Sequence, residues 1–465
     1  MNDSSRGKLP SWPEHKLRAG SYRQDLSSDP NPEEHRNHVE PWLSALFQAE
    51  HLNLLIGSGL TAAIASVAGA PLAGMEPEPF NSLELADAVN AAARESAQRL
   101  GRGNPNIEDQ IRSIIDLIAG LQVMAKGEES DGGENSLSKE AKELATAWES
   151  QLDDVLNSFV KKVLDTERGI LQALEDADAP DRANHVRRLL GGFLLPFASR
   201  AGSRDRLHIF TTNYDRLIEY GCDLLGLRIV DRFVGTLTPV FQSSRLGVDL
   251  HYNPPGIRGE PRYLEGVVRL TKLHGSLDWR CRTGPSGGVE VRRCALPFGT
   301  AENHPELPEK ASESVLIYPN PAKDVETLEY PYAELFRDFA AAVCRPNAVV
   351  VTYGYGFGDD HVNRILADML TIPSTHLVIV SWDTAGGRLE RFCERVGRDE
   401  QITLLIGKHF ADLDTLIQHY LPKPAIDRTT WRMVELLQRR ARPLNGSGGG
   451  ESSGDRENSN REAGK

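Results

Sequence analysis

The sequence is poor in cysteine and has no long apolar run, and each deficit excludes a class of protein. Five cysteines are scattered over 465 residues and none belongs to a Cys-x-x-Cys pair, so we expect neither a disulfide framework nor a four-cysteine zinc site. A membrane-spanning helix needs roughly 20 apolar residues, and no stretch approaches this length. The polar N-terminus has no secretory signal. We therefore expect a cytoplasmic protein without a membrane partner.

Basic residues are also in deficit. Lys and Arg total 53 against 66 Asp and Glu, which gives a net charge of -13 and argues against direct binding of nucleic acid. A hydrophobic content of 40% is enough for a substantial core, and 465 residues exceed the usual length of one domain. We expect a main domain with an insertion, or two domains.

The order of the predicted elements indicates an α/β fold. Short apolar runs predict strands at residues 51–56, 207–211, 267–273, 315–318, 348–353, 376–382 and 402–406. Most alternate with segments of helical periodicity at residues 215–225, 332–344, 361–370 and 385–396. This alternation predicts a Rossmann-like parallel sheet with helices on both faces, whose ligands bind beyond the carboxyl ends of the strands.

Composition divides the chain further. Residues 82–198 have helical periodicity without strand signals, which predicts a helical insertion within a core made of residues 39–81 and 199–422. We expect a flexible N-terminal arm at residues 1–38, a C-terminal helix at 423–444 and a disordered Gly- and Ser-rich tail at 445–465.

Glycine-rich turns follow two of the predicted strands. Gly57-Ser58-Gly59-Leu60-Thr61 could hold a pyrophosphate at a helix N-terminus, although an ordinary strand-to-helix turn would have the same composition. Later, Gly354-Tyr355-Gly356-Phe357-Gly358 precedes Asp359-Asp360-His361, where either aspartate could simply cap a helix.

Polar residues end two other predicted strands. Thr211-Thr212-Asn213-Tyr214-Asp215 has groups that are costly to bury unless they bind something, and a helix cap would explain only one of them. His274 stands between Leu273 and Gly275, where the chain can turn and leave the imidazole facing a cleft, although a lone histidine is more often structural.

In their order along the chain, the four motifs resemble the NAD-binding core of the sirtuin family, and more closely its bacterial sirtuin-like branch found in antiphage defence. The resemblance implies an enzyme that hydrolyses NAD to nicotinamide and ADP-ribose and thereby depletes it. On this basis Asn213 and His274 are the candidate catalytic residues. The implied NAD-binding residues are Gly57, Ser58, Gly59, Leu60, Thr61, Thr212, Asp215, Gly354, Tyr355, Gly356, Phe357 and Asp383.

Departures from the sirtuin pattern speak against peptide deacylation. Only Cys281 and Cys294 stand where deacetylating sirtuins have a four-cysteine zinc module, so we expect no metal. Gly356 replaces a serine of the family, and Thr212 replaces a glutamine. The insertion and the helix start at Asn106-Ile107-Glu108-Asp109 look like the defence branch, which implies a HerA-type hexameric ATPase partner. The apolar stripes of the insertion predict a homo-oligomer, although its helices could simply bury one another beside the sheet.

The chemistry can also be argued from the residues. Nicotinamide leaves a cationic ring as a neutral group, so the transition state resembles an oxocarbenium ion and needs little acid assistance. Asn213 can orient water or a ribose hydroxyl, and His274 can accept a proton. The alternative is a non-catalytic subunit that binds NAD or ADP-ribose, but binding alone does not require this pair.

Overall fold

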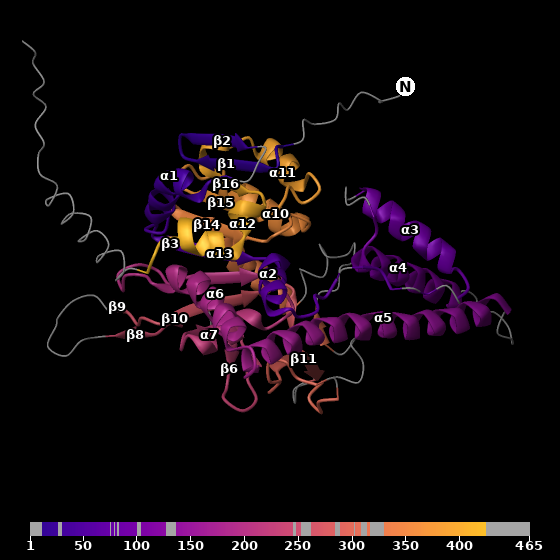
Figure 1. Cartoon of the computed structure of the whole chain (residues 1–465). Coiled ribbons are helices and arrows are strands. Elements are labelled where there is room, and N and C mark those ends of the chain that lie inside the picture. The colour runs from indigo at the N-terminus through magenta and orange to yellow at the C-terminus, as the bar shows by residue number, and fades with distance from the viewer. Residues whose placement is uncertain are drawn as a thin grey trace, which may run out of the picture. The chain divides into compact units, whose positions relative to one another are not determined.

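Within the described residues, a nine-stranded sheet has the order β2-β1-β16-β15-β14-β3-β4-β10-β5 (Figure 1). The computed structural model describes residues 12–424 except 27–29, 75, 79, 81–82, 100–103, 127–135, 245–247, 253–261, 284–288, 302, 308–313 and 317–329. The strands are β1 (His15–Ala19), β2 (Tyr22–Leu26), β3 (His51–Ile56), β4 (His208–Thr211), β5 (Arg228–Val230), β10 (Val267–Lys272), β14 (Ala348–Tyr353), β15 (His376–Ser381) and β16 (Ile402–Ile406). All pairings from β16 to β5 are parallel, and β1 and β2 add an antiparallel edge.

Helices cover both faces of this sheet, as the alternation predicted. Along β3, Leu54 and Ile56 pack into one core cluster and Leu55 into the other. The first face is covered by α1 (Pro32–Leu46), α2 (Ser58–Ala68), α6 (Pro180–Ala198), α7 (Leu217–Leu224), α12 (Lys408–Ala411), α13 (Leu413–Thr415) and the π-helix η4 (Leu416–Tyr420). The second face is covered by α9 (Tyr332–Val343), α10 (Asp360–Met369) and α11 (Arg388–Val396), and the 3-10 helix η3 (Asp399–Gln401) leads into β16. The predicted α/β class is confirmed.

The expectation of a flexible arm is wrong for residues 15–26 and 30–38. β1 pairs antiparallel with β16, and Leu17 is buried in the core. The helix α1 then begins after Asn31, whose side chain accepts a hydrogen bond from the main-chain nitrogen of Glu33. β1 buries only alternate residues and no residue of β2 is buried, so the composition of this segment resembles that of a polar arm.

The helical region between β3 and β4 is divided between two cores. α3 (Ala86–Arg99), α4 (Ile107–Ala125) and the first part of α5 (Ser136–Glu175) enclose a cluster around Trp148. The end of α5 and all of α6 join the main core instead, through residues such as Ile170 and Phe193. α6 therefore belongs with the sheet, although its helical periodicity placed it in the insertion.

A second, antiparallel sheet takes two strands from before β10 and three from after it. It has the order β13-β11-β12-β7-β6, and its strands are β6 (Phe233–Val234), β7 (Val240–Phe241), β11 (Gly275–Thr283), β12 (Val289–Arg293) and β13 (Ser314–Leu316). β8 (His251–Tyr252) and β9 (Arg262–Tyr263) form a separate pair. Of the run predicted at 315–318, residues 315 and 316 thus contribute to this sheet and not to the parallel one, and the other two lie outside the described residues.

Two further observations concern the ends and the membrane. The expected helix at 423–444 lies outside the described residues apart from 423 and 424, and so does the whole expected tail at 445–465. No helix in the described part of the chain is long and apolar enough to cross a membrane.

Candidate functional site

The carboxyl ends of four parallel strands are level with one another. Lys272 pairs with Thr211, Thr211 with Ile56, and Ile56 with Tyr353. The two glycine turns begin directly after Ile56 and Tyr353, whereas Asn213 and His274 each follow two residues after Thr211 and Lys272. The sheet register therefore brings together segments that are far apart in the chain, at the edge where parallel sheets bind ligands.

A cavity of about 260 Å³ lies at this edge. Its lining residues are Gly57, Ser58, Thr61, Leu72, Ala73, Asn106, Phe159, Val163, Thr166, Thr212, Asn213, Tyr214, Asp215, His274, Tyr355, Gly356, Gly358, Asp359 and Arg388. A larger cavity of about 810 Å³, around Glu219 and Trp279, is lined by none of the residues predicted for NAD. The smaller cavity is thus the one that the residues predicted for NAD line.

The two glycine-rich turns pack directly against each other. The main-chain nitrogen of Gly59 donates to the oxygen of Gly354 over 3.1 Å, and that of Gly57 donates to the oxygen of Tyr353 over 3.0 Å. A Cβ on Gly59 would lie 2.5 Å from the Cα of Gly354, which itself has a φ of +60°. These glycines therefore allow close contact of two backbones, and the amides of Gly57 and Gly59 are used within the protein rather than on a phosphate.

Asn213 and Asp215 join the β4 end to the start of α2. The side-chain nitrogen of Asn213 donates to the main-chain oxygen of Gly57 over 3.1 Å and to Thr61 Oγ1 over 3.3 Å. Thr61 in turn donates to Asp215 Oδ2 over 2.8 Å, and Asp215 Oδ1 accepts from the main-chain nitrogen of Leu217. Both of these hydrogen bonds use the side-chain nitrogen of Asn213, so its side-chain oxygen is the acceptor that it can offer to a ligand.

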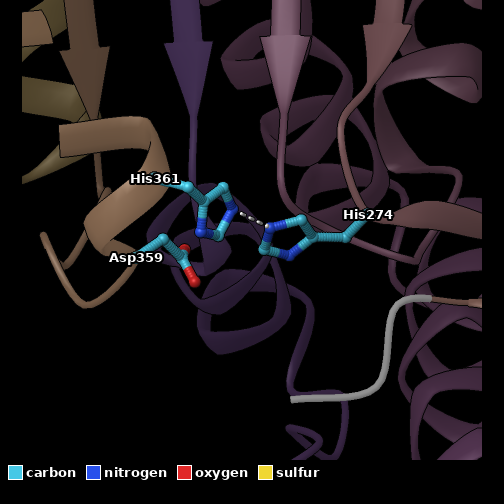
Figure 2. Close-up of side chains that lie close together, drawn as sticks. All are labelled: His274, Asp359 and His361. Carbon is cyan, nitrogen blue, oxygen red and sulfur yellow. Dashed lines mark hydrogen bonds between the residues drawn. The ribbon is translucent and has the colours of Figure 1, made fainter. Parts of the chain in front are cut away.

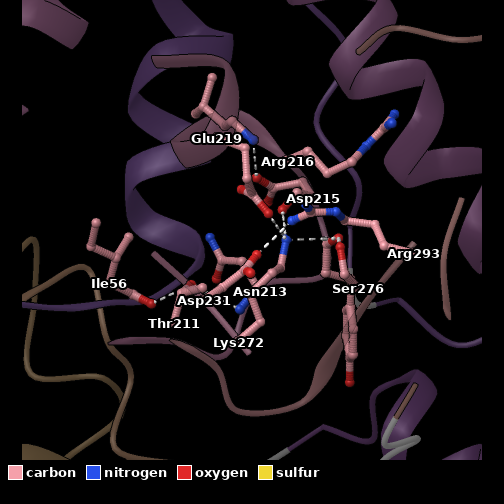
Figure 3. Close-up of polar contacts among 12 residues, drawn as sticks. Ile56, Thr211, Asn213, Asp215, Arg216, Glu219, Asp231, Lys272, Ser276 and Arg293 are labelled. Carbon is pink, nitrogen blue, oxygen red and sulfur yellow. Dashed lines mark hydrogen bonds and ion pairs between the residues drawn. The ribbon is translucent and has the colours of Figure 1, made fainter. Parts of the chain in front are cut away.

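The buried side chain of Lys272 stabilises the turn that carries Asn213. Lys272, at the end of β10, donates to the main-chain oxygens of Tyr214 and Asp215 and pairs with Glu219 over 3.0 Å (Figure 3). Desolvation raises the pKa of Glu219, and the charge of Lys272 opposes this rise. The positive charge holds two main-chain oxygens in place and thereby fixes the direction of the Asn213 turn.

His274 faces a second histidine. Its Nε2 lies 3.2 Å from Nε2 of His361, the second residue of α10, and the carboxylate of Asp359 lies beside them (Figure 2). Both histidines are buried, whereas Asp359 is half-buried. Asp359 occupies the N-cap position of α10, but its side chain makes no capping hydrogen bond. The capping interpretation of this residue is therefore wrong.

The helical insertion forms one wall of the cavity. Phe159 of α5 packs edge-on against Tyr214 with ring centroids 5.6 Å apart, and Thr166 accepts from the main-chain nitrogen of Ala73. Further along α5, Glu167 forms a buried ion pair with Arg216 and also accepts from its main-chain nitrogen over 2.8 Å. The insertion is thus attached to the segment that leads from Asp215 into α7.

Arg388 brings a positive charge to the cavity. Its Nε donates to the main-chain oxygen of Gly356 over 2.7 Å, which places the guanidinium beside the late glycine turn. Across this turn the buried phenol of Tyr355 donates to Asn363, and desolvation raises the pKa of Tyr355 well above its ordinary value. Tyr355 therefore remains neutral, and Arg388 is the cation beside the turn that can attract a phosphate.

Residues 207–404 match the family model described as a SIR2-like domain. No curated protein matches the chain. A SIR2-like domain indicates NAD-dependent activity, and the matched range contains Asn213, His274 and the late glycine turn. The turn at Gly57 lies outside the range, but β3 inserts between β4 and β14 and so completes the same sheet.

The cavity includes nine of the residues predicted for the site: Gly57, Ser58, Thr61, Thr212, Asn213, Asp215, His274, Tyr355 and Gly356. The other five, which the structure also describes, lie outside its lining: Gly59, Leu60, Gly354, Phe357 and Asp383. Leu60 and Phe357 are buried in the two cores, and Asp383 is exposed and caps its own turn by accepting from Ala385.

Sequence reasoning missed Arg388, the pairing of His361 with His274, and the wall formed by α5. Asp359 and His361 were visible next to a strand-to-helix turn, but only their local role was considered. The helix start at Asn106 is confirmed, because Asn106 and Asp109 form a capping box at α4. Asn106 also lines the cavity, a role that no local signal could indicate.

Proposed function

We propose that this chain is a sirtuin-like NAD hydrolase that releases nicotinamide and ADP-ribose. The observation that carries the proposal is the meeting of Asn213 and His274 in one cavity at the carboxyl ends of β4 and β10. One is an amide that can orient a nucleophile, and the other is a base that can take its proton. The match of this segment to a SIR2-like domain supports NAD as the substrate.

In the proposed reaction, the bond between nicotinamide and ribose breaks first. The leaving group is neutral, so the enzyme's task is to hold the oxocarbenium-like ring and to place water. The amide oxygen of Asn213 orients that water or a ribose hydroxyl, and His274 accepts the proton. General base catalysis of this type contributes on the order of a hundred- to ten-thousandfold in rate.

The dimensions of the cavity support a regulated enzyme. Ligand sites usually enclose about 300–1,000 Å³, so a cavity of about 260 Å³ is small for a dinucleotide. We infer that the α5 wall near Phe159 moves when NAD enters, and that the closed form is inactive. We infer that self-assembly or a HerA-type ATPase partner opens it, so that NAD is depleted only on demand, as an antiphage effector requires.

Nicotinamide release is the decisive measurement. Purified full-length chain is incubated with NAD, with and without a HerA-type ATPase, and free nicotinamide is quantified. We expect cleavage by the wild type and a loss of at least a hundredfold in His274→Ala. NAD binding without release under every condition would favour the alternative, a non-catalytic subunit that binds NAD or ADP-ribose. Light scattering during size exclusion tests the expected homo-oligomer.

A further inference from the structure

Two buried imidazoles and a carboxylate converge at the cavity wall. The nitrogen and oxygen atoms that His274, Asp359 and His361 can offer all lie within 4.8 Å of one another. His274 follows β10, whereas the other two begin α10 after β14, so the sheet register and not the local sequence brings them together. In Figure 2 the two rings point toward each other and the carboxylate lies next to His361.

The spacing suits a metal ion. A zinc ion binds imidazole nitrogen at about 2.0–2.1 Å, so two such ligands at a tetrahedral angle stand about 3.3 Å apart. The two Nε2 atoms are 3.2 Å apart. The carboxylate of Asp359 offers an oxygen within 4.8 Å of both imidazoles, so it is close enough to be the third ligand.

The ligand types favour a transition metal over magnesium or calcium. Imidazole binds Zn²⁺ and its neighbours in the first transition row, whereas Mg²⁺ and Ca²⁺ prefer oxygen ligands. Three protein ligands leave a fourth tetrahedral position, and His274 and Asp359 both line the cavity. The fourth position therefore faces the space in which the substrate would lie.

We propose that His274, Asp359 and His361 bind a zinc-type divalent cation and that this cation inhibits the enzyme. The inhibition rests on the proposed NAD hydrolysis, but the binding does not. A coordinated Nε2 has no lone pair left with which to accept a proton, so metal-bound His274 cannot serve as a base. Removal of the metal restores the free imidazole.

Binding is tested with Zn²⁺ alone on the full chain. We expect one zinc per chain by calorimetry and chelator competition, and a weakening of about tenfold or more in Asp359→Asn and in His361→Gln. Asp360→Asn is the matched control, because it removes the adjacent carboxylate at the same helix N-terminus, where Asp360 is exposed and outside the cluster. Thermal unfolding shows that each variant is folded.

Two results would overturn the site. One is an absence of zinc binding by the folded wild type, which would identify the contact between Nε2 atoms as a simple N–H···N hydrogen bond. The other is zinc affinity that is the same in Asp359→Asn, Asp360→Asn and wild type, which would place the metal elsewhere.

Inhibition is tested separately on the active enzyme. Zinc should lower nicotinamide release and a chelator should restore it, with about tenfold more zinc needed in Asp359→Asn. Activation by zinc would overturn the inhibitory role. If zinc binds through these three residues but no condition gives NAD cleavage, the proposed function fails and the metal site stands. If NAD is cleaved but zinc does not bind, the metal site fails and the proposed function stands.

Discussion

The side-chain nitrogen of Asn213 lies 3.1 Å from the main-chain oxygen of Gly57, so this residue joins the end of β4 to the first turn of α2. From the sequence, Asn213 belonged to a group of polar residues that are costly to bury unless they bind something. It lines the cavity, but only 7% of it is exposed and its nitrogen holds the backbone of a neighbouring element. Catalysis and stability therefore depend on the same side chain.

Replacement of Asn213 should affect both properties. Asn213→Ala leaves the oxygen of Gly57 without this partner, which should cost about 1–3 kcal/mol of unfolding free energy. Cleavage of NAD should fall by at least a hundredfold even at temperatures where the variant is fully folded. Thr61→Val removes a partner of Asn213 but keeps its amide, so it should lose stability and retain more turnover. Equal turnover per folded molecule in the two variants would contradict a catalytic role for Asn213.

The contact between the glycine turns predicts a large difference in unfolding free energy between two glycine-to-alanine variants. In Gly59→Ala the new Cβ would lie 2.5 Å from the Cα of Gly354, and neither backbone can move without shifting a strand end. We expect a loss of at least about 3 kcal/mol, comparable to severe core substitutions. Gly358→Ala is the control, since no atom lies within 4 Å of its Cβ position. Denaturant unfolding of both variants measures the difference.

The main sheet could be predicted from the sequence because its strands are buried on both faces. Such strands appear as continuous apolar runs, and β3, β4, β14, β15 and β16 all do so. The strand ends could be predicted too, because Asn213 and His274 follow such runs directly. A parallel sheet then places those ends at one edge without any further information.

The remaining features depend on pairings that leave no local signal. β1 has only three buried positions, and its partner β16 is encoded almost 400 residues later in the chain. His361 and Glu167 each have a plausible local role in a helix, whereas their contacts with His274 and Arg216 arise only when the sheet forms. The contact between Gly59 and Gly354 leaves no local signal for the same reason: a glycine that permits close backbone contact looks like one in a ligand-binding turn.

Arg388 should contribute to NAD affinity. Its guanidinium is beside Gly356 at the cavity wall, and a charge-assisted bond to phosphate there would strengthen binding. Arg388→Gln should raise the KM for NAD about tenfold, with a smaller effect on kcat. Arg391→Gln is the matched control, because Arg391 is exposed on the same helix and outside the cavity lining. Equal KM values for both variants would exclude Arg388 from the site.

One buried and one half-buried histidine, His208 and His376, predict a loss of stability in mild acid. Burial lowers the pKa of His376 to about 4, and burial with nearby Arg269 and Arg232 lowers that of His208 well below its ordinary value. The folded state keeps both neutral, whereas the unfolded chain binds protons below about pH 6.5. Unfolding free energy should therefore fall as the pH drops from about 6.5 toward 4, with His376 responsible for on the order of 1–3 kcal/mol.

Denaturant unfolding at several pH values measures this slope. His376→Gln should make it shallower between pH 6.5 and 4, because the residue that the unfolded chain protonates is gone. His304→Gln replaces a half-exposed histidine and serves as the control. An unchanged slope in His376→Gln would assign the acid sensitivity to other groups.

The ion pair between Glu167 and Arg216 should hold the helical insertion against the NAD-binding core. Glu167 is 1% exposed and accepts from both the guanidinium and the main-chain nitrogen of Arg216. Glu167→Ala leaves a buried, uncompensated guanidinium, which should cost about 3–5 kcal/mol. Glu143→Ala removes an exposed carboxylate of the same helix and should change stability by less than about 0.5 kcal/mol.

Because the pair also anchors the α5 wall, hydrogen exchange around Phe159 should increase in Glu167→Ala at conditions where the sheet stays protected. Equal protection in the two variants would mean that other contacts, and not this pair, keep the wall closed.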